Sequence, residues 1–446
     1  MTDVPSPSGP TTGAVDVAPG LQRWRSHPVL LNVLVAAALF GSAILVWVVP
    51  RSIIAFMAFQ ASLLVIYLLP LDVRTKLAWA AVALGVLMPM LGTHNGYYME
   101  VAIQVGIFVA LALGLNIVVG LAGLLDLGYV AFYAVGAYLW AIFGSPQAAK
   151  FLPIEGVFPL PAPWFFAFLI LGLAVGAITG ILLGLPVLRL RGDYLAIVTL
   201  GFGEVVRVLA NNLDKPWNIT NGPKGITPIS RPPLFFEPAL SALGIDAPPS
   251  VLYPLLFYFM VLGIAAVVIV INRRLEGSHV GRAWEAIRED EVAAQAMGVP
   301  LVRMKLLAFA IGASFAGVMG VIFSAKQLFI SPESFTFLES IGVLAMVILG
   351  GMGSIPGAII GASAVTILNL QVLKGLSLWL NELRNSGLTV LGYNLADLPS
   401  QFEPAKYERM IFGMILILMM IYRPAGIFPA RRRKLETYHR GEEPAA

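Results

Sequence analysis

Residues 101–119 have the sequence VAIQVGIFVALALGLNIVV, and none of these side chains is charged. An α-helix needs about 20 residues to cross the hydrocarbon core of a bilayer, so this stretch has the length and polarity of a membrane span. Between residues 101 and 188 the only charged side chains are Asp126, Lys150 and Glu155. These charged side chains are too few to cover the surface of a soluble protein. They predict a chain that is embedded in a lipid bilayer.

The composition of the whole chain agrees with this prediction. Of 446 residues, 58% are hydrophobic and 12% are charged, whereas soluble domains carry about 25% charged residues. The absence of cysteine excludes disulfides, thiol nucleophiles and thiolate metal sites. The four histidines are far apart in the chain, so no metal site is expected.

Apolar runs recur along the chain and predict an all-α polytopic membrane protein with about 10 to 12 transmembrane helices. Several runs are shorter than the roughly 17 residues of a minimal span, which favours some short, broken or re-entrant helices. The runs are 30–49, 53–69, 77–91, 101–119, 127–143, 164–185, 195–209, 251–271, 306–324, 341–349, 357–370 and 410–422.

The ends of the chain and its basic residues predict the orientation. Residues 1–28 are rich in proline and poor in large apolar side chains, which predicts a disordered tail. The run 30–49 is longer than the core of a signal peptide and is therefore expected to be a retained span. Lys and Arg favour cytoplasmic loops, and twelve spans with both termini in the cytoplasm place five basic clusters inside, with fewer basic residues on the opposite face. Those groups lie at 23–25, 74–76, 189–191, 273–305 and in the basic cytoplasmic tail 430–446.

The longest cytoplasmic loop contains GRAWEAIREDEVAAQAMG at 281–298, a composition that favours helix. Gly298 is expected to end this helix, and Pro300 prevents its continuation. A cytosolic helix with one apolar face must cover that face, either against its own span ends and the lipid surface or against a partner protein. The residues near that face are Trp284, Ile287, Ala294 and Met297.

Polar residues inside apolar segments are candidates for the translocation path. Asn116 and Asp126 are two of them, because a carboxylate in an apolar stretch is costly and usually faces a cavity or a partner. The alternative is that Asp126, which falls between two spans, is solvated at the cytoplasmic mouth. Glu204 and Arg207 are three residues apart, so they are expected to form an ion pair on one helix face, with a gate as the alternative.

A glycine-rich break joins two short apolar runs near residue 350. Such a break exposes helix ends and free carbonyls that suit the carboxylate and ammonium groups of a zwitterion. A tight hairpin turn is the competing interpretation. The candidate residues are Gly350, Gly351, Gly353 and Ser354.

Four segments carry a resemblance to a known family. Ala293-Ala294-x-x-x-Gly298 with Glu291 resembles the EAA loop of ABC-importer permeases, although the position of that family's Glu is occupied by Val292. The segments 114–138, 188–204 and 348–361 resemble the signatures of branched-chain amino-acid permeases of the LivM type. The resemblance covers about 101–429, with the coupling helix at 278–299. It is consistent with residues 29–100 being the N-terminal extension, of about three spans, that longer LivM-type subunits carry.

The resemblance implies a permease subunit of an ATP-driven importer of leucine, isoleucine and valine in the inner membrane of a bacterium. It implies a second, LivH-like permease subunit, two cytosolic ABC ATPases and an extracytoplasmic binding protein as partners. The chain itself has no Gly followed by Lys, hence no P-loop. No catalytic residue, metal, cofactor or nucleic-acid partner is therefore expected, and ATP would be bound by the partner subunits.

Other functions remain open at this stage. Related ABC permeases carry urea, short amides or sugars, and share the architecture that the resemblance implies. A secondary transporter coupled to protons or sodium would need ionisable residues near the membrane midplane, and the candidates are Asp126, Glu204 and Glu339.

Overall fold

The computed structural model describes residues 28–49, 52–152, 154, 156–187, 193–242, 247–385, 389–390, 393–394, 407–423 and 425–429. The predicted tails 1–28 (apart from Pro28) and 430–446 lie outside the described residues, as do Arg189 and Arg191. The chain divides into two compact units, Met1–Glu100 and Val101–Ala446.

The described residues form an all-α polytopic membrane protein, as the apolar runs predict. Nine helices are long and apolar enough to cross a membrane, and three shorter apolar helices accompany them in the part of the chain that the structure describes. Each of the twelve matches one predicted run. The only strands among these residues are β1 (Thr389–Val390) and β2 (Tyr393–Asn394), which form one short antiparallel pair.

The first unit is built from hydrophobic helices that follow one another along the chain. They are α2 (Pro28–Val48), α3 (Ile53–Leu68), α4 (Val73–Val82), the π-helical turn η2 (Ala83–Leu87) and α5 (Met88–His94). Pro89 has no N–H to donate, and the π-helical turn immediately before it changes the hydrogen-bond register, so the span 73–94 continues past the proline. Within the unit, Trp79 Nε1 donates to Asn32 Oδ1 at 2.9 Å.

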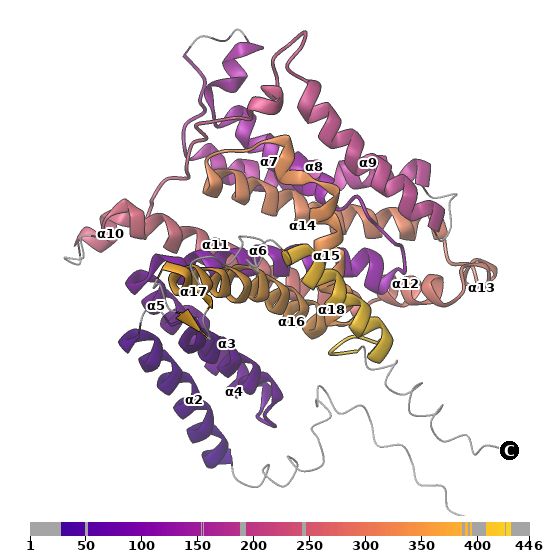
Figure 1. Cartoon of the computed structure of the whole chain (residues 1–446). Helices are drawn as coiled ribbons and strands as arrows, with labels where there is room; N and C mark the ends of the chain where they lie inside the picture. Colours follow the sequence, from indigo (N-terminus) through magenta and orange to yellow (C-terminus); the bar gives the residue numbers. More distant parts are fainter. Residues whose placement is uncertain are drawn as a thin grey trace, which may run out of the picture. The chain divides into compact units, whose positions relative to one another are not determined.

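The second unit contains the remaining helices (Figure 1). The unit boundary falls within α6 (Gly96–Leu115), which runs into the π-helical turn η3 (Asn116–Leu121). The longer helices that follow are α7 (Val130–Phe143), α8 (Trp164–Val187), α9 (Asp193–Asn212), α11 (Pro249–Glu276), α14 (Leu301–Gln327), α15 (Phe337–Gly350), α16 (Ile355–Ile367), α17 (Lys374–Asn385) and α18 (Glu408–Tyr422). Shorter elements are η4 (Pro146–Lys150), η5 (Gly222–Lys224), α10 (Glu237–Ala242), α12 (His279–Glu289), α13 (Glu291–Ala296), η6 (Pro332–Phe335) and η7 (Leu368–Leu373).

The core of the second unit is the packing of α14 against α7 and α8 (Figure 1). Glycines make this packing possible. On α8, Gly176 lies so close to α14 that an added Cβ would be 2.6 Å from Ala313 O, and Gly180 is equally close to Phe309 O. In lipid no hydrophobic force draws helices together, so close backbone approach at small residues supplies the contact. The three helices therefore form a block held by backbone contacts.

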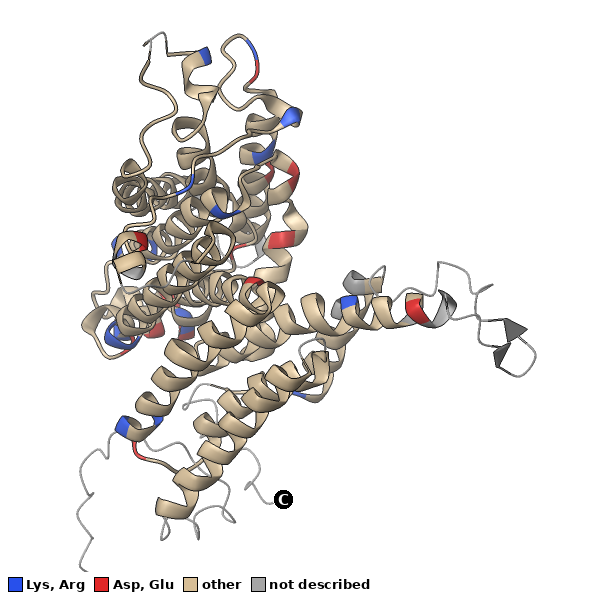
Figure 2. Ribbon diagram, turned by 90° about the vertical axis from the view of Figure 1, so that its left-hand side faces the viewer, with Lys and Arg blue, Asp and Glu red and all other residues tan. Residues whose placement is uncertain are grey.

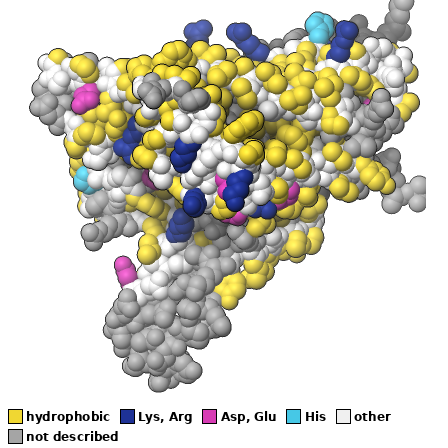
Figure 3. Space-filling model, turned by 90° about the horizontal axis from the view of Figure 1, so that it is seen from above, with side chains coloured by type: hydrophobic (Ala, Val, Ile, Leu, Met, Phe, Trp, Pro, Cys, Tyr) yellow, Lys and Arg dark blue, Asp and Glu magenta, His cyan; other side chains and the backbone are white. Residues whose placement is uncertain are grey.

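The outer surface of the helices suits lipid. Charged residues are rare along the membrane-spanning helices and concentrate near helix ends and in loops (Figure 2). Large apolar side chains are exposed on these helices, for example Ile170, Leu182 and Val267. Figure 3 shows hydrophobic side chains spread over one face of the molecule. Exposed apolar area on this scale is what a bilayer, rather than water, would cover.

Two spans exceed their apolar runs by the largest margin. The run 341–349 lies inside a helical segment of 332–350, and the run 357–370 lies inside a helical span of 355–379. The hydropathy runs stop early because polar residues lie within the helices, and two of them, Ser340 and Gln371, are buried in the protein. Polar side chains that point inward do not prevent a helix from spanning a membrane.

Candidate coupling segment and translocation path

The segment predicted as one cytosolic helix is two helices, α12 and α13, which are labelled at the right of Figure 1. Asp290 separates them with an extended backbone (φ −154°, ψ 110°). Its carboxylate accepts hydrogen bonds from Val292 N–H (2.8 Å) and Ala293 N–H (3.0 Å). These bonds satisfy the first N–H groups of α13, so Asp290 acts as its N-cap and starts a new helix.

The first of the two helices covers its apolar face within the chain itself. Trp284 and Ile287 are buried. The Trp284 Nε1–H donates to Met304 O at 2.7 Å, at the start of α14. Ser278 caps the N-terminus of α12 by accepting from Gly281 N–H at 3.2 Å. Trp284 and Ile287 therefore hold α12 against the membrane-embedded bundle, and their side chains are not available to a partner.

The second helix is exposed. In α13 Ala294 is buried, but Val292 is 61% exposed. Met297, predicted to share the buried face, is 85% exposed, because it follows the last residue of α13 and the break at Asp290 turns that helix away from the direction of α12. Gly298 ends the segment with a left-handed backbone (φ +86°), as its position predicted. The exposed part of the segment is therefore α13, whereas the apolar face of α12 that contains Trp284 is covered.

Glu291 has a partner inside the chain. Its Oε1 lies 2.7 Å from Lys305 Nζ, in the second turn of α14. The Lys305 side chain is almost completely buried and the Glu291 side chain mostly so. The pair ties the first turn of α13 to α14.

The glycine-rich break is a tight turn between α15 and α16. Gly351 (φ +121°) and Gly353 (φ +78°) have backbone conformations that L side chains rarely adopt. Ser354 caps α16 by accepting from Gly357 N–H at 3.2 Å. The carbonyl of Gly350 accepts from Phe428 N–H at 2.9 Å. Gly351, Gly353 and Ser354 are buried, Met352 is partly exposed, and the chain's own C-terminal segment contributes to the hydrogen bonding of the turn.

Asn116 lies in the same neighbourhood. It is fully buried, and its Oδ1 accepts from Gly353 N–H at 2.8 Å. One turn later, the carbonyl of Gly120 accepts a hydrogen bond from Arg288 Nη1. Three segments that are distant in sequence, η3, α12 and the turn after α15, thus meet at one place.

Asp126 is buried rather than solvated at the mouth. It lies in the loop between η3 and α7, outside the spans, and its Oδ1 accepts from Gly128 N–H at 2.9 Å. Its Oδ2 has no hydrogen-bond partner among the described residues. Burial raises the pKa of Asp126 to about 7, and the hydrogen bond from Gly128 N–H acts in the opposite direction. The loop is held against α9 because Leu127 N–H donates to Thr199 Oγ1 at 3.0 Å.

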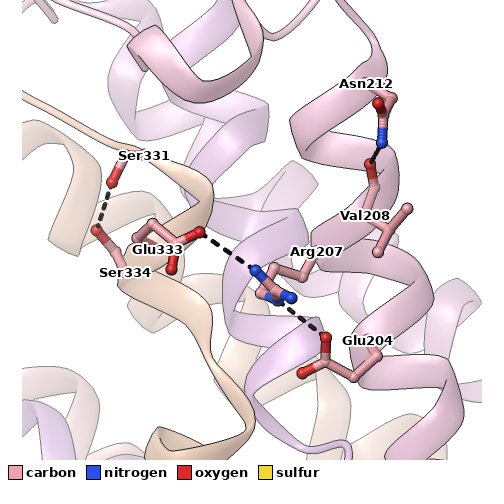
Figure 4. A network of polar contacts seen from close by, with 7 residues as sticks. All are labelled: Glu204, Arg207, Val208, Asn212, Ser331, Glu333 and Ser334. Atoms are coloured by element: carbon pink, nitrogen blue, oxygen red, sulfur yellow. Dashed lines mark hydrogen bonds and ion pairs between the residues drawn. The ribbon is translucent and has the colours of Figure 1, made fainter.

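Glu204 and Arg207 pair on α9, as Figure 4 shows. Arg207 Nε lies 2.9 Å from Glu204 Oε2, and Arg207 Nη1 lies 3.2 Å from Glu333 Oε1 in η6. Arg207 therefore bridges two carboxylates and two elements. Next to this network is a small hollow between α7, α9 and α15, and Glu204, Thr336 and Ser340 are the polar residues in its lining.

Sequence patterns did not identify the contact of Arg288. Its distance from Gly120 is 168 residues along the chain, and no local spacing indicates such a pair. The N-cap at Asp290 did have a signal, since Asp is a preferred N-cap residue. Within the described residues, no group of three or more His, Asp or Glu side chains is arranged to hold a metal ion.

Comparison with known proteins adds to this geometry. The family described as "Branched-chain amino acid transport system / permease component" matches residues 97–420. The chain belongs to this permease family. Its match begins in α6 and ends in α18, so it includes the candidate coupling segment and the glycine turn.

Relatives of this permease bear names of the same kind. The permease is 39% identical over 352 residues to the high-affinity branched-chain amino acid transport system permease protein LivM of Salmonella typhimurium, which covers 76% of this chain and 71% of the relative. The LivM protein of Escherichia coli K12 is equally similar. The LivH protein of Salmonella typhimurium is 24% identical over 322 residues, or 72% of this chain and 90% of the relative. No solved structure matches this permease.

Proposed function

We propose that this permease is the membrane-spanning subunit of an ATP-driven importer of leucine, isoleucine and valine. The names of the LivM relatives support this substrate class. The similarity extends over most of the chain, including the coupling segment and the glycine turn. The substrate would reach the permease from an extracytoplasmic binding protein and cross at an interface with a second, LivH-like permease subunit.

The observation that carries the ATP-driven part of the proposal is the exposure of α13. Val292 lies on this short helix, which has few charges, and Met297 directly follows it; both are large apolar side chains and both are exposed. Glu291 and the cap at Asp290 hold this helix in place, and Trp284 fixes the preceding helix α12 against α14. A rigidly held helix with an apolar outer surface suits a groove on a partner protein. We assign α13 as the part that docks on the ATPases, which would bind ATP.

A pull-down experiment tests the docking. The permease is expressed with its LivH-like partner and both ATPases, and co-purification of the ATPases is measured for Val292→Asp and Met297→Asp. Both variants are expected to lose the ATPases while the permease stays inserted, because a charge would enter an apolar interface. Trp217→Asp is the matched control, since Trp217 is also exposed but lies on the loop after α9. ATPase recovery at the wild-type level in both α13 variants would refute the docking assignment.

A transport assay tests the substrate and the energy source. Uptake of labelled leucine, urea and ribose is measured in vesicles that hold the permease with and without its partner subunits and binding protein. ATP-dependent uptake of leucine in the complete system is the expected result. Uptake of urea or ribose instead would change the substrate class. Leucine uptake by the permease alone under an ion gradient would show a secondary transporter.

The remaining proposals concern location and orientation. We place the protein in the bacterial inner membrane with α12 and α13 in the cytoplasm, since basic residues such as Arg273, Arg274 and Arg282 accompany these helices. Both termini would then be cytoplasmic. The helices of 29–100 would be an extension outside the matched family region, which begins at residue 97.

A further inference from the structure

The cytosolic segment is attached to the membrane-embedded bundle at two separate places. One attachment is to α14, through Trp284 to Met304 O and through Glu291 to Lys305. The other is to η3, through Arg288 to the carbonyl of Gly120. The first attachment is to α14, which packs against α7 and α8. The second is to η3, which also packs against α14 and in addition reaches the glycine turn through Asn116.

Close packing shapes the second attachment. The side chain of Arg288 passes over Gly123 (φ +71°), where an added Cβ would lie 2.8 Å from Arg288 Cγ and 3.0 Å from Arg288 Cβ. At its far end the guanidinium meets the carbonyl of Gly120. That carbonyl is near the C-terminal end of the helical span 96–121, where carbonyls lack a partner in the helix and the helix dipole favours a cation. A guanidinium is suited to this position by both charge and donors.

The π-helical turn η3, which contains Gly120, also contacts the glycine turn between α15 and α16. Asn116 Oδ1 accepts from Gly353 N–H at 2.8 Å. An added Cβ at Gly353 would be 3.0 Å from Arg288 Nη1 and 3.1 Å from Gly120 O. The guanidinium of Arg288 therefore lies against the glycine turn as well as against Gly120. Any side chain at residue 353 would separate them.

We propose that Arg288 is the positioning residue that transmits movement of the cytosolic segment to the turn between α15 and α16. The route runs from Arg288 to the carbonyl of Gly120 and from Asn116 to Gly353 N–H. A push on α13 is carried through α12 and Arg288 to η3, and from η3 through Asn116 to the glycine turn. The glycine turn then moves relative to α14. This inference rests on the proposed docking of ATPases on α13.

The test separates coupling from docking and from folding. Arg288→Met keeps the apolar stem of the side chain but removes its donors and its charge. Arg282→Met is the matched control, because Arg282 lies on the same helix and is exposed, and among the described residues its hydrogen-bond partners are the nearby Gly277 O and His279 Nδ1. In the assembled importer, co-purified ATPase, ATP hydrolysis and substrate uptake are measured for each variant.

The expected result is that Arg288→Met retains the ATPases and their hydrolysis while uptake per ATP hydrolysed falls about tenfold. Arg288→Lys, which keeps the charge, should be intermediate, and Arg282→Met should match the wild type. Asn116→Ala removes the second step of the route and should also lower the ratio. If Arg288→Met does not assemble, Asn116→Ala decides the question by the same ratio.

A second readout follows the turn itself. The chain contains no cysteine, so Met352→Cys places a single thiol of this subunit in the turn, where Met352 is partly exposed. Its reaction rate with a thiol reagent is expected to differ between the nucleotide-free importer and the importer trapped with ATP and vanadate. The difference should disappear when Arg288→Met or Asn116→Ala is added.

The outcomes are distinct. Wild-type uptake per ATP in an assembled Arg288→Met importer, or a nucleotide-dependent change at Met352→Cys that survives the substitution, would overturn the transmitting role of Arg288. ATPases that stay bound to the Val292→Asp and Met297→Asp variants would instead overturn the docking proposal. The measurements therefore distinguish a failure of the transmission proposal from a failure of the docking proposal.

Discussion

Lys305 Nζ and Glu291 Oε1 lie 2.7 Å apart and join α13 to α14. Lys305 is only 4% exposed, so its ammonium group depends on this carboxylate for compensation. The pair gives Glu291 a place in the structure that does not require a partner protein.

Replacing Glu291 by Gln is expected to lower stability. A nearly buried ammonium would lose its counter-charge, and with Glu291 partly exposed the cost is about 2 kcal/mol. Thermal unfolding in detergent measures it. Glu289→Gln on the exposed side of α12 should leave the melting temperature unchanged. The double variant Glu291→Met, Lys305→Met should recover most of the loss, and equal melting of Glu291→Gln and wild type would show that the pair contributes nothing.

Trp284→Phe is expected to destabilise the permease without releasing the ATPases. The substitution removes the donor to Met304 O and leaves that carbonyl without this bond, which costs about 1 to 2 kcal/mol. Melting temperature and ATPase co-purification are measured together. Trp217→Phe on an exposed loop is the control. Loss of ATPases at unchanged stability would place Trp284 in the docking surface after all.

Asp126 predicts a dependence of stability on pH. Burial raises its pKa to about 7 in the folded protein, against an ordinary value of 3.8. The folded state therefore binds the proton more tightly, and stability falls as the pH rises from about 4 to about 7, by on the order of 4 kcal/mol. Asp126→Asn, which stays neutral, should remove this fall. Melting temperatures at about pH 5 and about pH 8 measure it; the same pH dependence in wild type and variant would be the contrary result.

Gly317→Ala is expected to disrupt the second unit. An added methyl group would collide with the backbone of Gly172 and lie 3.2 Å from Gly176 Cα, so α8 and α14 would have to separate. Overpacking of this kind costs about 1 to 3 kcal/mol or more. Gly263→Ala is the control, because nothing lies within 4 Å of the added group there. The yield of monodisperse protein in size-exclusion chromatography reports the difference, and comparable yields would contradict backbone contact.

Arg207→Met is expected to have a small effect on stability. The ion pairs of Arg207 are partly exposed (Figure 4), and such pairs contribute about 1 kcal/mol or less. Uptake should remain close to the wild-type level if the network is structural. A large loss of uptake at unchanged stability would identify Arg207 as part of a gate.

The spans were predictable because the bilayer imposes them. A helix that crosses hydrocarbon must be long and apolar, and the sequence displays that requirement directly. Boundaries failed where polar residues face inward: Gln371 is fully buried within the span 355–379, yet it counts as polar in any hydropathy window. Hydropathy measures composition and has no information on the direction of a side chain.

Local spacing predicted part of the candidate site. The separation of Glu204 from Arg207 placed both on one face of α9, where the structure joins them. The helix propensities around Asp290 favoured one helix over two, because they are summed over a window and outweigh a single capping residue. The contact of Arg288 with Gly120 was out of reach, since it depends on how distant segments pack.

The backbone contact between α8 and α14 limits how the importer can work. Where glycine meets a carbonyl, there is no layer of side chains that can change rotamer and let the helices slide. We therefore expect α7, α8 and α14 to move together as one rigid body. Movement during a transport cycle must then be concentrated at the margins of that body, in loops and turns where the backbone is free to bend.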